Sequence, residues 1–229
     1  MDNLNKKSVL AYMKSSPCLE HLPDETLELL RQVSSLKKYE KGEYLHKRGD
    51  SPTAYYGLLK GRIRASAVSQ QGKALSLYIF NPGDWFGEIS LLDGISRTHD
   101  AEVLDSAEVL MIPASSFEKW VLGDVESLRK VASAVCGRLR LAMQYIEESA
   151  TLPLESRLAS RLLQMYPNTH NVSQQELAHM LGVSRQSVSK QLVSWQEAGW
   201  ISTEYNGLQV TNLSALQQIG QYETVPKAH

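Results

Sequence analysis

The spacing of apolar residues changes sharply near Pro113, and this change constrains the fold more than any other feature of the sequence. From about Lys37 to Pro113, short runs alternate apolar and polar residues and are separated by glycine turns. In LSLYI, residues 75–79, every second side chain is aliphatic. Because successive residues of a strand face opposite sides, this pattern predicts an antiparallel barrel or sandwich of roughly 80 residues.

A helix is expected before the strands. Residues Leu22–Leu36 predict a short amphipathic helix. Asp24 and Glu25 suit its first turn, because carboxylates are stabilised by the partial positive charge at a helix N-terminus.

A second helical region follows the strands, from Phe117 to Ala150. Small and apolar residues recur there at alternating spacings of four and three: Leu128, Ala132, Val135, Leu139, Ala142, Ile146 and Ser149. A heptad seam sustained over three repeats favours packing against a partner helix in a parallel dimer. The alternative is a helix that packs only on its own barrel.

Pro153 interrupts the helical pattern and divides the chain. Proline lacks an N–H group and disfavours helix at the preceding residue, so a new helix is expected to start near it. We therefore predict a barrel domain over residues 1–116, a dimerisation helix over 117–150, a hinge over 151–154 and a second domain over 155–229.

The segment Ser173–Gly199 predicts two helices joined by a tight turn. Ser173 and Glu176 form an S-x-x-E capping box, Gly182 allows the turn, and Ser184 can cap the second helix. The side chains expected to face inward are Leu177, Ala178, Leu181, Val188 and Leu192. Gly199 then ends the second helix.

Two short strands around an Asn206-Gly207 turn follow, which is a hairpin signal. Helix, turn, helix and hairpin together predict a winged helix-turn-helix. The alternative is a helix pair that serves as scaffolding or as a protein contact.

The start of the second helix carries side chains that can read DNA: Ser184, Arg185, Gln186, Ser187, Ser189 and Lys190. In a major groove, Arg185 suits guanine, Gln186 suits adenine, and Lys190 can reach a base or a phosphate. A well-formed bidentate base contact contributes about 1–3 kcal/mol of discrimination.

Composition limits the other possibilities. The net charge is −1, and the residues from Thr151 onward carry five basic and five acidic side chains, so DNA contact depends on placement. Cys18 and Cys136 have no metal-ligand spacing and are expected to be buried, so we expect no metal. No Ser/His/Asp order stands out, so we expect no enzyme. With no signal peptide and no membrane-spanning run, we expect a cytoplasmic protein.

The loop FGEISLLDGISRTHDAEV, residues 86–103, carries Glu88 after a glycine and Arg97 nine residues later. Together with KGEYLHKRGD, YYGLLKGRI, NPGDW and SRQSVSK, it resembles the cyclic-AMP receptor protein and fumarate–nitrate regulator (CRP/FNR) family of bacterial transcription factors. The resemblance covers nearly the whole chain. It implies an α+β fold with a cyclic-nucleotide-binding antiparallel β-roll (a double-stranded β-helix), a long dimerisation helix and a C-terminal winged helix-turn-helix.

In that family this loop is the phosphate-binding cassette. The resemblance implies that Glu88 binds the ribose 2′-hydroxyl, that Arg97 binds the cyclic phosphate, and that Thr98 adds a hydroxyl. Backbone N–H groups of Gly87, Glu88, Ile89 and Ser90 would line the phosphate. The chemistry is sound, because a guanidinium fork matches phosphate oxygens and a helix N-terminus offers free donors. The alternative is a Glu88–Arg97 ion pair in a cassette that binds no nucleotide.

The sequence departs from the receptor protein at two sites. Ala142 and Met143 stand where the receptor has a Thr-Ser pair that contacts adenine, and neither can make those hydrogen bonds. Base recognition would then use apolar packing or Thr98, so cyclic AMP is the first choice and cyclic GMP the alternative. Gln186 replaces a glutamate that reads cytosine, so the operator should differ there.

The expected mechanism is a homodimer that binds a palindromic operator on double-stranded DNA. Its recognition helices would lie about one turn, ~34 Å, apart. Nucleotide between barrel and dimer helix would change how the two long helices meet, and the hinge would transmit that change. The short connection Met165–Ser173 lacks the loop that contacts RNA polymerase in the receptor protein, so activation and repression are both open.

Three alternative functions remain. The first is a regulator of this family that senses haem, a gas, redox state or another metabolite. The second is constitutive. The third is a cyclic-nucleotide module that acts through protein contacts and never touches DNA.

Overall fold

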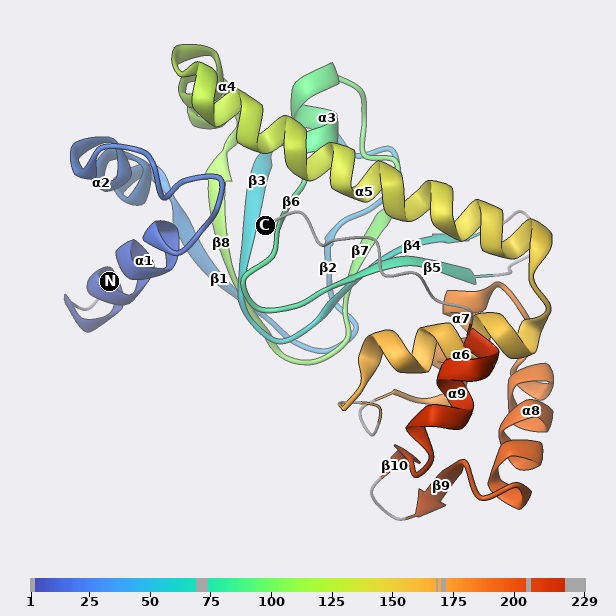
Figure 1. Cartoon of the computed structure of the whole chain (residues 1–229). Coiled ribbons are helices and arrows are strands. Elements are labelled where there is room, and N and C mark those ends of the chain that lie inside the picture. The colour runs from blue at the N-terminus through green and yellow to red at the C-terminus, as the bar shows by residue number, and fades with distance from the viewer. Residues whose placement is uncertain (1–2, 69–73, 168, 170–171, 205–206, 221–229) are drawn as a thin grey trace. The chain divides into compact units, whose positions relative to one another are not determined.

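A computed structural model describes residues 3–68, 74–167, 169, 172–204 and 207–220 (Figure 1). Its internal contacts divide the described chain into two compact units. The first unit contains residues 3–67 and 77–139, and the second contains residues 68, 74–76 and 140–220. We describe each unit by itself.

Two four-stranded sheets form the body of the first unit. Their strands are β1 (Ser35–Tyr39), β2 (Tyr44–His46), β3 (Ala54–Lys60), β4 (Ile63–Val68), β5 (Ala74–Phe80), β6 (Trp85–Phe86), β7 (Asp100–Val103) and β8 (Ala107–Pro113). One sheet has the order β1-β8-β3-β6 and the other β2-β7-β4-β5. The pairs β1–β8, β3–β8, β3–β6, β2–β7 and β4–β7 are antiparallel, which confirms the predicted antiparallel fold.

Strand β3 is buried on both faces, and two adjacent tyrosines show why. Tyr56 packs with Phe80 and Phe86 in a core built from both sheets. Tyr55, on the opposite face, packs with Trp85 and with apolar residues of the helices. Because both faces of the strand are covered, its sequence is a nearly continuous apolar run rather than an alternating one.

The outer core contains residues of helices α1 (Asn3–Lys14), α2 (Asp24–Val33) and α4 (Ala114–Gly123). On α1, Tyr12 stacks on Trp85 at 5.4 Å between ring centroids, and its hydroxyl donates to the Leu58 carbonyl at 3.0 Å. Helix α1 has no counterpart in the sequence-based expectations. The expected helix over Leu22–Leu36 is shorter, because Ser35 and Leu36 already belong to β1.

The expected helical region over Phe117–Ala150 is two helices, because the chain breaks at Asp124 before α5 (Val125–Thr151). The Asp124 carboxylate accepts a hydrogen bond from the Ser127 N–H at 2.7 Å and another from its hydroxyl. These bonds lower the pKa of Asp124, with a smaller contribution from His21. Asp124 therefore caps a new helix start, as a carboxylate does at this position.

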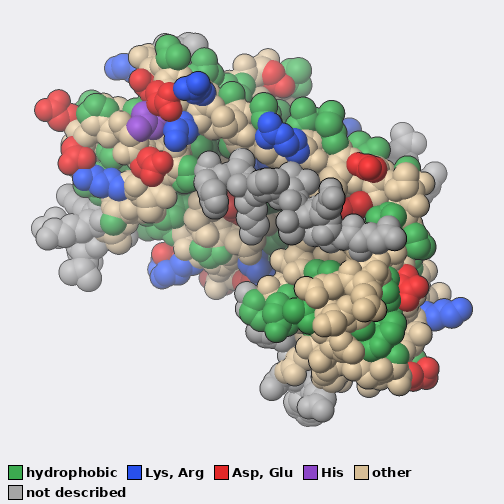
Figure 2. Space-filling model, viewed as in Figure 1, with side chains coloured by type: hydrophobic (Ala, Val, Ile, Leu, Met, Phe, Trp, Pro, Cys, Tyr) green, Lys and Arg blue, Asp and Glu red, His purple; other side chains and the backbone are tan. Residues whose placement is uncertain are grey.

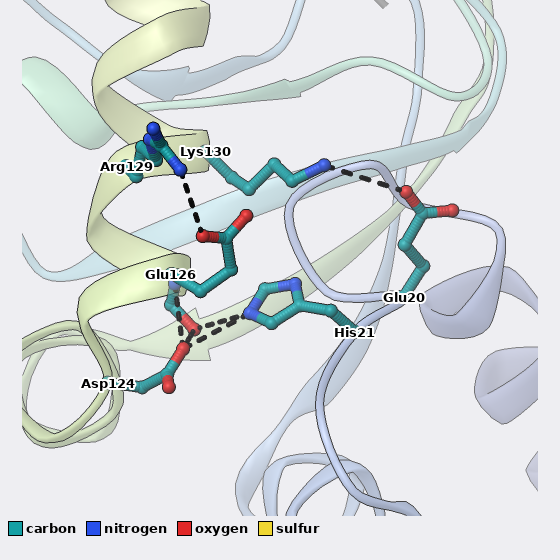
Figure 3. Close-up of polar contacts among 7 residues, drawn as sticks. Glu20, His21, Asp124, Glu126, Arg129 and Lys130 are labelled. Atoms are coloured by element: carbon teal, nitrogen blue, oxygen red, sulfur yellow. Dashed lines mark hydrogen bonds and ion pairs between the residues drawn. The ribbon is translucent and has the colours of Figure 1, made fainter.

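A polar cluster attaches the segment before α2 to the start of α5 (Figure 3). His21 Nε2 lies 3.1 Å from the Asp124 carboxylate and 3.0 Å from the Ser127 hydroxyl, while Lys130 reaches Glu20 at 4.0 Å. Both His21 contacts use the same ring nitrogen. The Ser127 hydroxyl also donates directly to the Asp124 carboxylate, so the three side chains connect the segment before α2 to the start of α5.

One face of α5 is buried and another is exposed. Ser127 and Val131 are fully buried, whereas Leu139 is 53% exposed and Ile146 is 66% exposed. Cys136 is exposed on the same helix, so the expectation that both cysteines are buried is wrong for it. Within the described residues, no helix is both long and apolar enough to cross a membrane.

The second unit is a winged helix-turn-helix, as predicted. Its elements are α6 (Leu154–Met165), α7 (Gln174–Leu181), α8 (Arg185–Glu197), β9 (Ile201–Glu204), β10 (Gly207–Val210) and α9 (Leu213–Gly220). Helix α6 begins directly after Pro153, as expected. The expected inward-facing side chains from Leu177 to Leu192 are buried. The hairpin strands pair Gly207 with Glu204, and residues 205–206 of its turn lie outside the described residues.

Candidate functional site

The cassette loop is built around a short helix, α3 (Glu88–Asp93), between two glycines. Gly87 has φ 94°, in the left-handed region that disfavours side chains. A Cβ at Gly87 would lie 2.9 Å from a Tyr56 ring carbon and 3.0 Å from Arg97 Nη1. Glycine is therefore required both by the backbone and by the close approach of the arginine.

Arg97 lies inside the first unit with only 4% of its surface exposed. Its Nη1 donates to the Gly87 carbonyl and its Nη2 donates to the Ala54 carbonyl, both at 2.6 Å. The guanidinium also lies over the Tyr56 ring, 5.3 Å from the centroid. Burial lowers the pKa of Arg97. Its Nε is buried and has no hydrogen-bond partner among the described residues.

Glu88 is 1% exposed and forms an ion pair with Arg138 of α5 through Oε1. Arg138 also donates to the Trp85 carbonyl and lies over the Phe80 ring, 5.6 Å from the centroid. Glu88 Oε2 is buried and unpaired within the described part of the chain. The alternative expectation of a Glu88–Arg97 ion pair is therefore wrong, because each group has a different partner.

Arg138 is absent from the sequence-predicted site, and its position follows only once the buried face of α5 is known. Ser127 and Val131 define the face of α5 that is buried in the first unit. Arg138 lies eleven residues after Ser127, which is about three helical turns, so it falls on the same face. A cation on this buried face needs an anionic partner, and Glu88 is that partner.

The remaining cassette residues differ in exposure. Ser90 is buried, and its hydroxyl donates to the Ser96 carbonyl at 3.5 Å, whereas Ile89 is 42% exposed. Thr98 is exposed, and its hydroxyl lies 2.8 Å from His99 Nδ1. The Thr98 hydroxyl therefore already has a neighbouring partner in this conformation.

Two histidines lie beside the cassette, His99 and His46, and neither is among the sequence-predicted site residues. The His46 ring centroid lies 5.7 Å from that of Tyr56, the ring that also contacts Arg97. Burial, followed by the positive charge of Arg97, lowers the pKa of His46 to about 4. Burial, followed by Arg48, lowers the pKa of His99.

Ala142 and Met143 are both exposed on α5, Met143 with 59% of its surface. They belong to the second unit, whereas the cassette belongs to the first. Their contact with a nucleotide base stays a prediction.

Among the expected DNA-reading residues, two serines cap helix α8 and the longer side chains are exposed. Ser184 accepts a hydrogen bond from the Ser187 N–H at 3.1 Å, and the two hydroxyls lie 2.8 Å apart. Arg185, Gln186 and Lys190 are exposed, whereas Ser189 is half-buried. The serine pair therefore fixes the start of α8, and the longer side chains are available to a partner.

Charge does not mark a DNA-binding face by itself. Figure 2 shows basic and acidic side chains interspersed on the face in view, without a single basic patch. This agrees with the balanced charge of residues 151–229. Recognition in α8 would depend on where its few cations and amides lie.

Two family models match this chain. The model described as "Cyclic nucleotide-binding domain" matches residues 36–124, and the one described as "Crp-like helix-turn-helix domain" matches residues 156–219. The two matches contain the cassette and helix α8 respectively.

Known proteins resemble the chain over most of its length. It is 22% identical over 205 residues to a CRP-like cAMP-activated global transcriptional regulator of Mycobacterium tuberculosis, covering 85% of this chain and 91% of that protein. It is 29% identical over 176 residues to transcriptional regulator SdrP of Thermus thermophilus, covering 72% and 83%.

Solved structures share the fold. A CRP/FNR-family structure from Eubacterium rectale superposes with a TM-score of 0.77 at 18% identity, covering 91% of this chain and all of that one. The ordered pair of domain matches, the cassette with its buried Glu88 and Arg97, and these relatives lead to one conclusion. The chain belongs to the CRP/FNR family of transcription regulators.

Proposed function

We propose that this regulator is a cytoplasmic homodimer that binds a palindromic DNA operator under the control of a cyclic nucleotide. Cyclic AMP is the first choice of effector, and cyclic GMP is the alternative. The protein acts by binding and not by catalysis. The Mycobacterium tuberculosis relative named as cAMP-activated supports the choice of effector.

The observation that carries the effector proposal is a pair of orphaned buried polar atoms. Glu88 Oε2 and Arg97 Nε have no hydrogen-bond partner among the described residues. A buried polar group without a partner costs about 1–3 kcal/mol, so a ligand that satisfies both atoms gains binding energy. A ribose hydroxyl can donate to the carboxylate, and a cyclic phosphate can accept from the guanidinium.

Arg138 gives the cassette a direct connection to α5. A ribose hydroxyl that donates to Glu88 Oε2 would draw negative charge away from Oε1, the oxygen that pairs with Arg138. Because Arg138 also holds the Trp85 carbonyl, weakening its ion pair would alter how α5 is held on the first unit. A coupling of about 1–3 kcal/mol would change operator affinity 5- to 150-fold.

The exposed seam of α5 supports the homodimer. The seven heptad positions from Leu128 to Ser149 are exposed or half-buried in the single chain. Exposed leucine and isoleucine at heptad spacing are typical of a helix that packs on a partner helix. Analytical ultracentrifugation should give twice the mass of one chain, and a monomer at micromolar concentration would contradict the proposal.

Calorimetry tests the effector. Protein freed of co-purified ligand should bind cyclic AMP, cyclic GMP or both, and binding should change operator affinity. Arg97→Gln should lose nucleotide binding, whereas Arg185→Ala should keep it and bind the operator more weakly. If neither nucleotide binds and operator binding persists, the effector proposal fails while the DNA-binding proposal stands.

A second candidate function is constitutive operator binding. It is favoured by the internal partners that the cassette already has: Arg138 for Glu88, and two backbone carbonyls for Arg97. In that case the protein without nucleotide binds its operator with full affinity, and neither nucleotide changes the binding curve.

A further inference from the structure

His46 brings a titratable ring into the same cluster as Arg97. It ends strand β2 and pairs with Ala101 of β7, beyond a register shift in the ladder. Its ring and the Arg97 guanidinium both contact Tyr56, with separations of 5.7 Å and 5.3 Å to that ring. His46 Nδ1 is buried and has no hydrogen-bond partner among the described residues.

The unpaired Nδ1 leaves His46 able to gain a proton or a hydrogen-bond partner without breaking any hydrogen bond that Nδ1 makes among the described residues. A neutral imidazole carries one donor and one acceptor, whereas a protonated imidazole carries two donors and a positive charge. Beside a buried guanidinium, the neutral form is favoured, because two adjacent cations repel in a poorly solvated site. An anion on Arg97 offsets this repulsion and shifts the balance toward the protonated ring.

We propose that His46 is a second cation of the effector site, and that it takes up a proton from solvent when an anionic nucleotide binds to Arg97. This inference rests on the proposed effector. The phosphate would meet two positive groups in the bound state and only one in the free state. The effector would therefore bind more tightly in acid.

The groups that act on His46 come from three elements. Burial and the Arg97 charge hold the pKa of His46 at about 4, while Asp50 of the following loop and Asp100 of β7 act to raise it. Asp50 accepts a hydrogen bond from the Lys47 N–H at 2.7 Å, and Asp100 accepts one from the Arg48 N–H at 2.7 Å. Both carboxylates are thus fixed near the loop that follows His46.

Linkage sets the size of the effect. A bound phosphate that offsets Arg97 removes the smaller of the two causes that lower the pKa of His46, so this pKa rises above about 4, while burial still holds it below the ordinary value of about 6.5. Between the free and the bound value, affinity increases about tenfold for each unit by which the pH falls. Above about pH 7 the affinity should be constant, because His46 is then neutral in both states.

Titration calorimetry with cyclic AMP between pH 5 and pH 8 tests this inference. In buffers of different ionisation enthalpy, wild-type protein should take up a measurable fraction of a proton per site near pH 5. The His46→Asn variant should bind with pH-independent affinity and take up no proton. His99→Asn and His21→Gln are the matched controls, and both should keep the pH dependence.

A measurement on the wild-type protein covers the case in which His46→Asn does not fold. The NMR signal of the His46 ring should titrate at a higher pH when cyclic AMP is present than when it is absent. An unchanged midpoint, or a pH dependence lost in His99→Asn instead, would overturn the inference.

The two proposals fail in different ways. Binding of cyclic AMP with constant affinity from pH 5 to pH 8 would refute the role of His46 and leave the nucleotide effector standing. Absence of binding for both nucleotides at every pH would refute the effector, and the role of His46 with it.

Discussion

Arg97 and Arg185 carry the same guanidinium group in opposite settings. Arg97 is 4% exposed, donates to two backbone carbonyls and lies over an aromatic ring. Arg185 is exposed at the first position of α8. The charged groups proposed to bind the effector, Glu88 and Arg97, are therefore buried in the core of the first unit, whereas the side chain of Arg185, proposed to bind DNA, is exposed on the surface of the second unit. A substitution at such a group in the first unit should therefore change both ligand affinity and the free energy of unfolding. A substitution in the second unit should change DNA affinity alone.

The largest expected effect is at the Glu88–Arg138 ion pair. Arg138→Met leaves a carboxylate of 1% exposure without its cation, so the free energy of unfolding should fall by roughly 3–5 kcal/mol. Urea unfolding followed by circular dichroism measures it. The double variant Glu88→Gln/Arg138→Met should recover much of the loss, since no buried charge is then left unpaired.

The matched control is Arg129→Met on the same helix. Arg129 is 78% exposed and pairs with Glu126 at 3.6 Å, so the change should cost less than about 1 kcal/mol. Equal losses for the two methionine variants would contradict the contrast between buried and exposed charge.

The cost in stability of replacing a glycine with alanine can be compared between the two units, at Gly87 and Gly199. Gly87→Ala meets an unfavourable φ, which costs about 1–2 kcal/mol, and also a clash with Tyr56 and Arg97 that adds about 1–3 kcal/mol. Gly199 also has a positive φ, 72°, but nothing lies within 4 Å of an added Cβ. Gly199→Ala should therefore lose only the backbone part, as urea unfolding can measure. A loss at Gly199 as large as that at Gly87 would show that crowding in the cassette contributes nothing.

In the second unit, a substitution of an exposed arginine should change DNA affinity rather than the free energy of unfolding. Arg185→Ala should weaken binding to a specific operator by about 1–3 kcal/mol, because the proposed bidentate base contact would be lost. Its free energy of unfolding should change little, because the side chain is exposed. Fluorescence anisotropy with labelled operator, paired with urea unfolding, measures both quantities. A large loss of stability with unchanged operator affinity would reverse the proposed contrast.

Much of the fold was predictable because it is encoded in local spacing. The capping box at Ser173 and Glu176 is present with both of its hydrogen bonds, and α6 begins after Pro153 as predicted. Helix caps and proline act within a few residues, so a sequence pattern contains all the information they need. The break at Asp124 is also local, because it depends on hydrogen bonds to Ser127, but the prediction of one helical region over Phe117–Ala150 missed it.

The site was predicted less completely, because its partners are far apart in sequence. Arg138 lies 50 residues from Glu88, and no spacing rule connects a helix to a loop of another layer. His46 reaches the cassette only through the pairing of β2 with β7, including its register shift. A single shift of register would turn this ring to the other face of the strand. Such contacts follow from the tertiary fold rather than from a motif.

The smallest expected effect is the loss of stability in acid that His46 causes. The pKa of His46 is lowered to about 4, below its value near 6.5 in the unfolded chain, because of burial and then Arg97. The folded state then binds fewer protons, so this contribution to stability is present above about pH 6.5 and is lost as the pH falls toward 4. At pH 5 the loss should be roughly 1–2 kcal/mol after allowance for partial exposure.

His46→Asn should remove that part of the decrease between pH 7.5 and pH 5, as urea unfolding at the two pH values can measure. His179→Gln on α7, outside the first unit, should leave the decrease in place. If His46→Asn loses as much stability in acid as the wild type, the His46 ring is solvated, and the cassette is less enclosed than its contacts indicate.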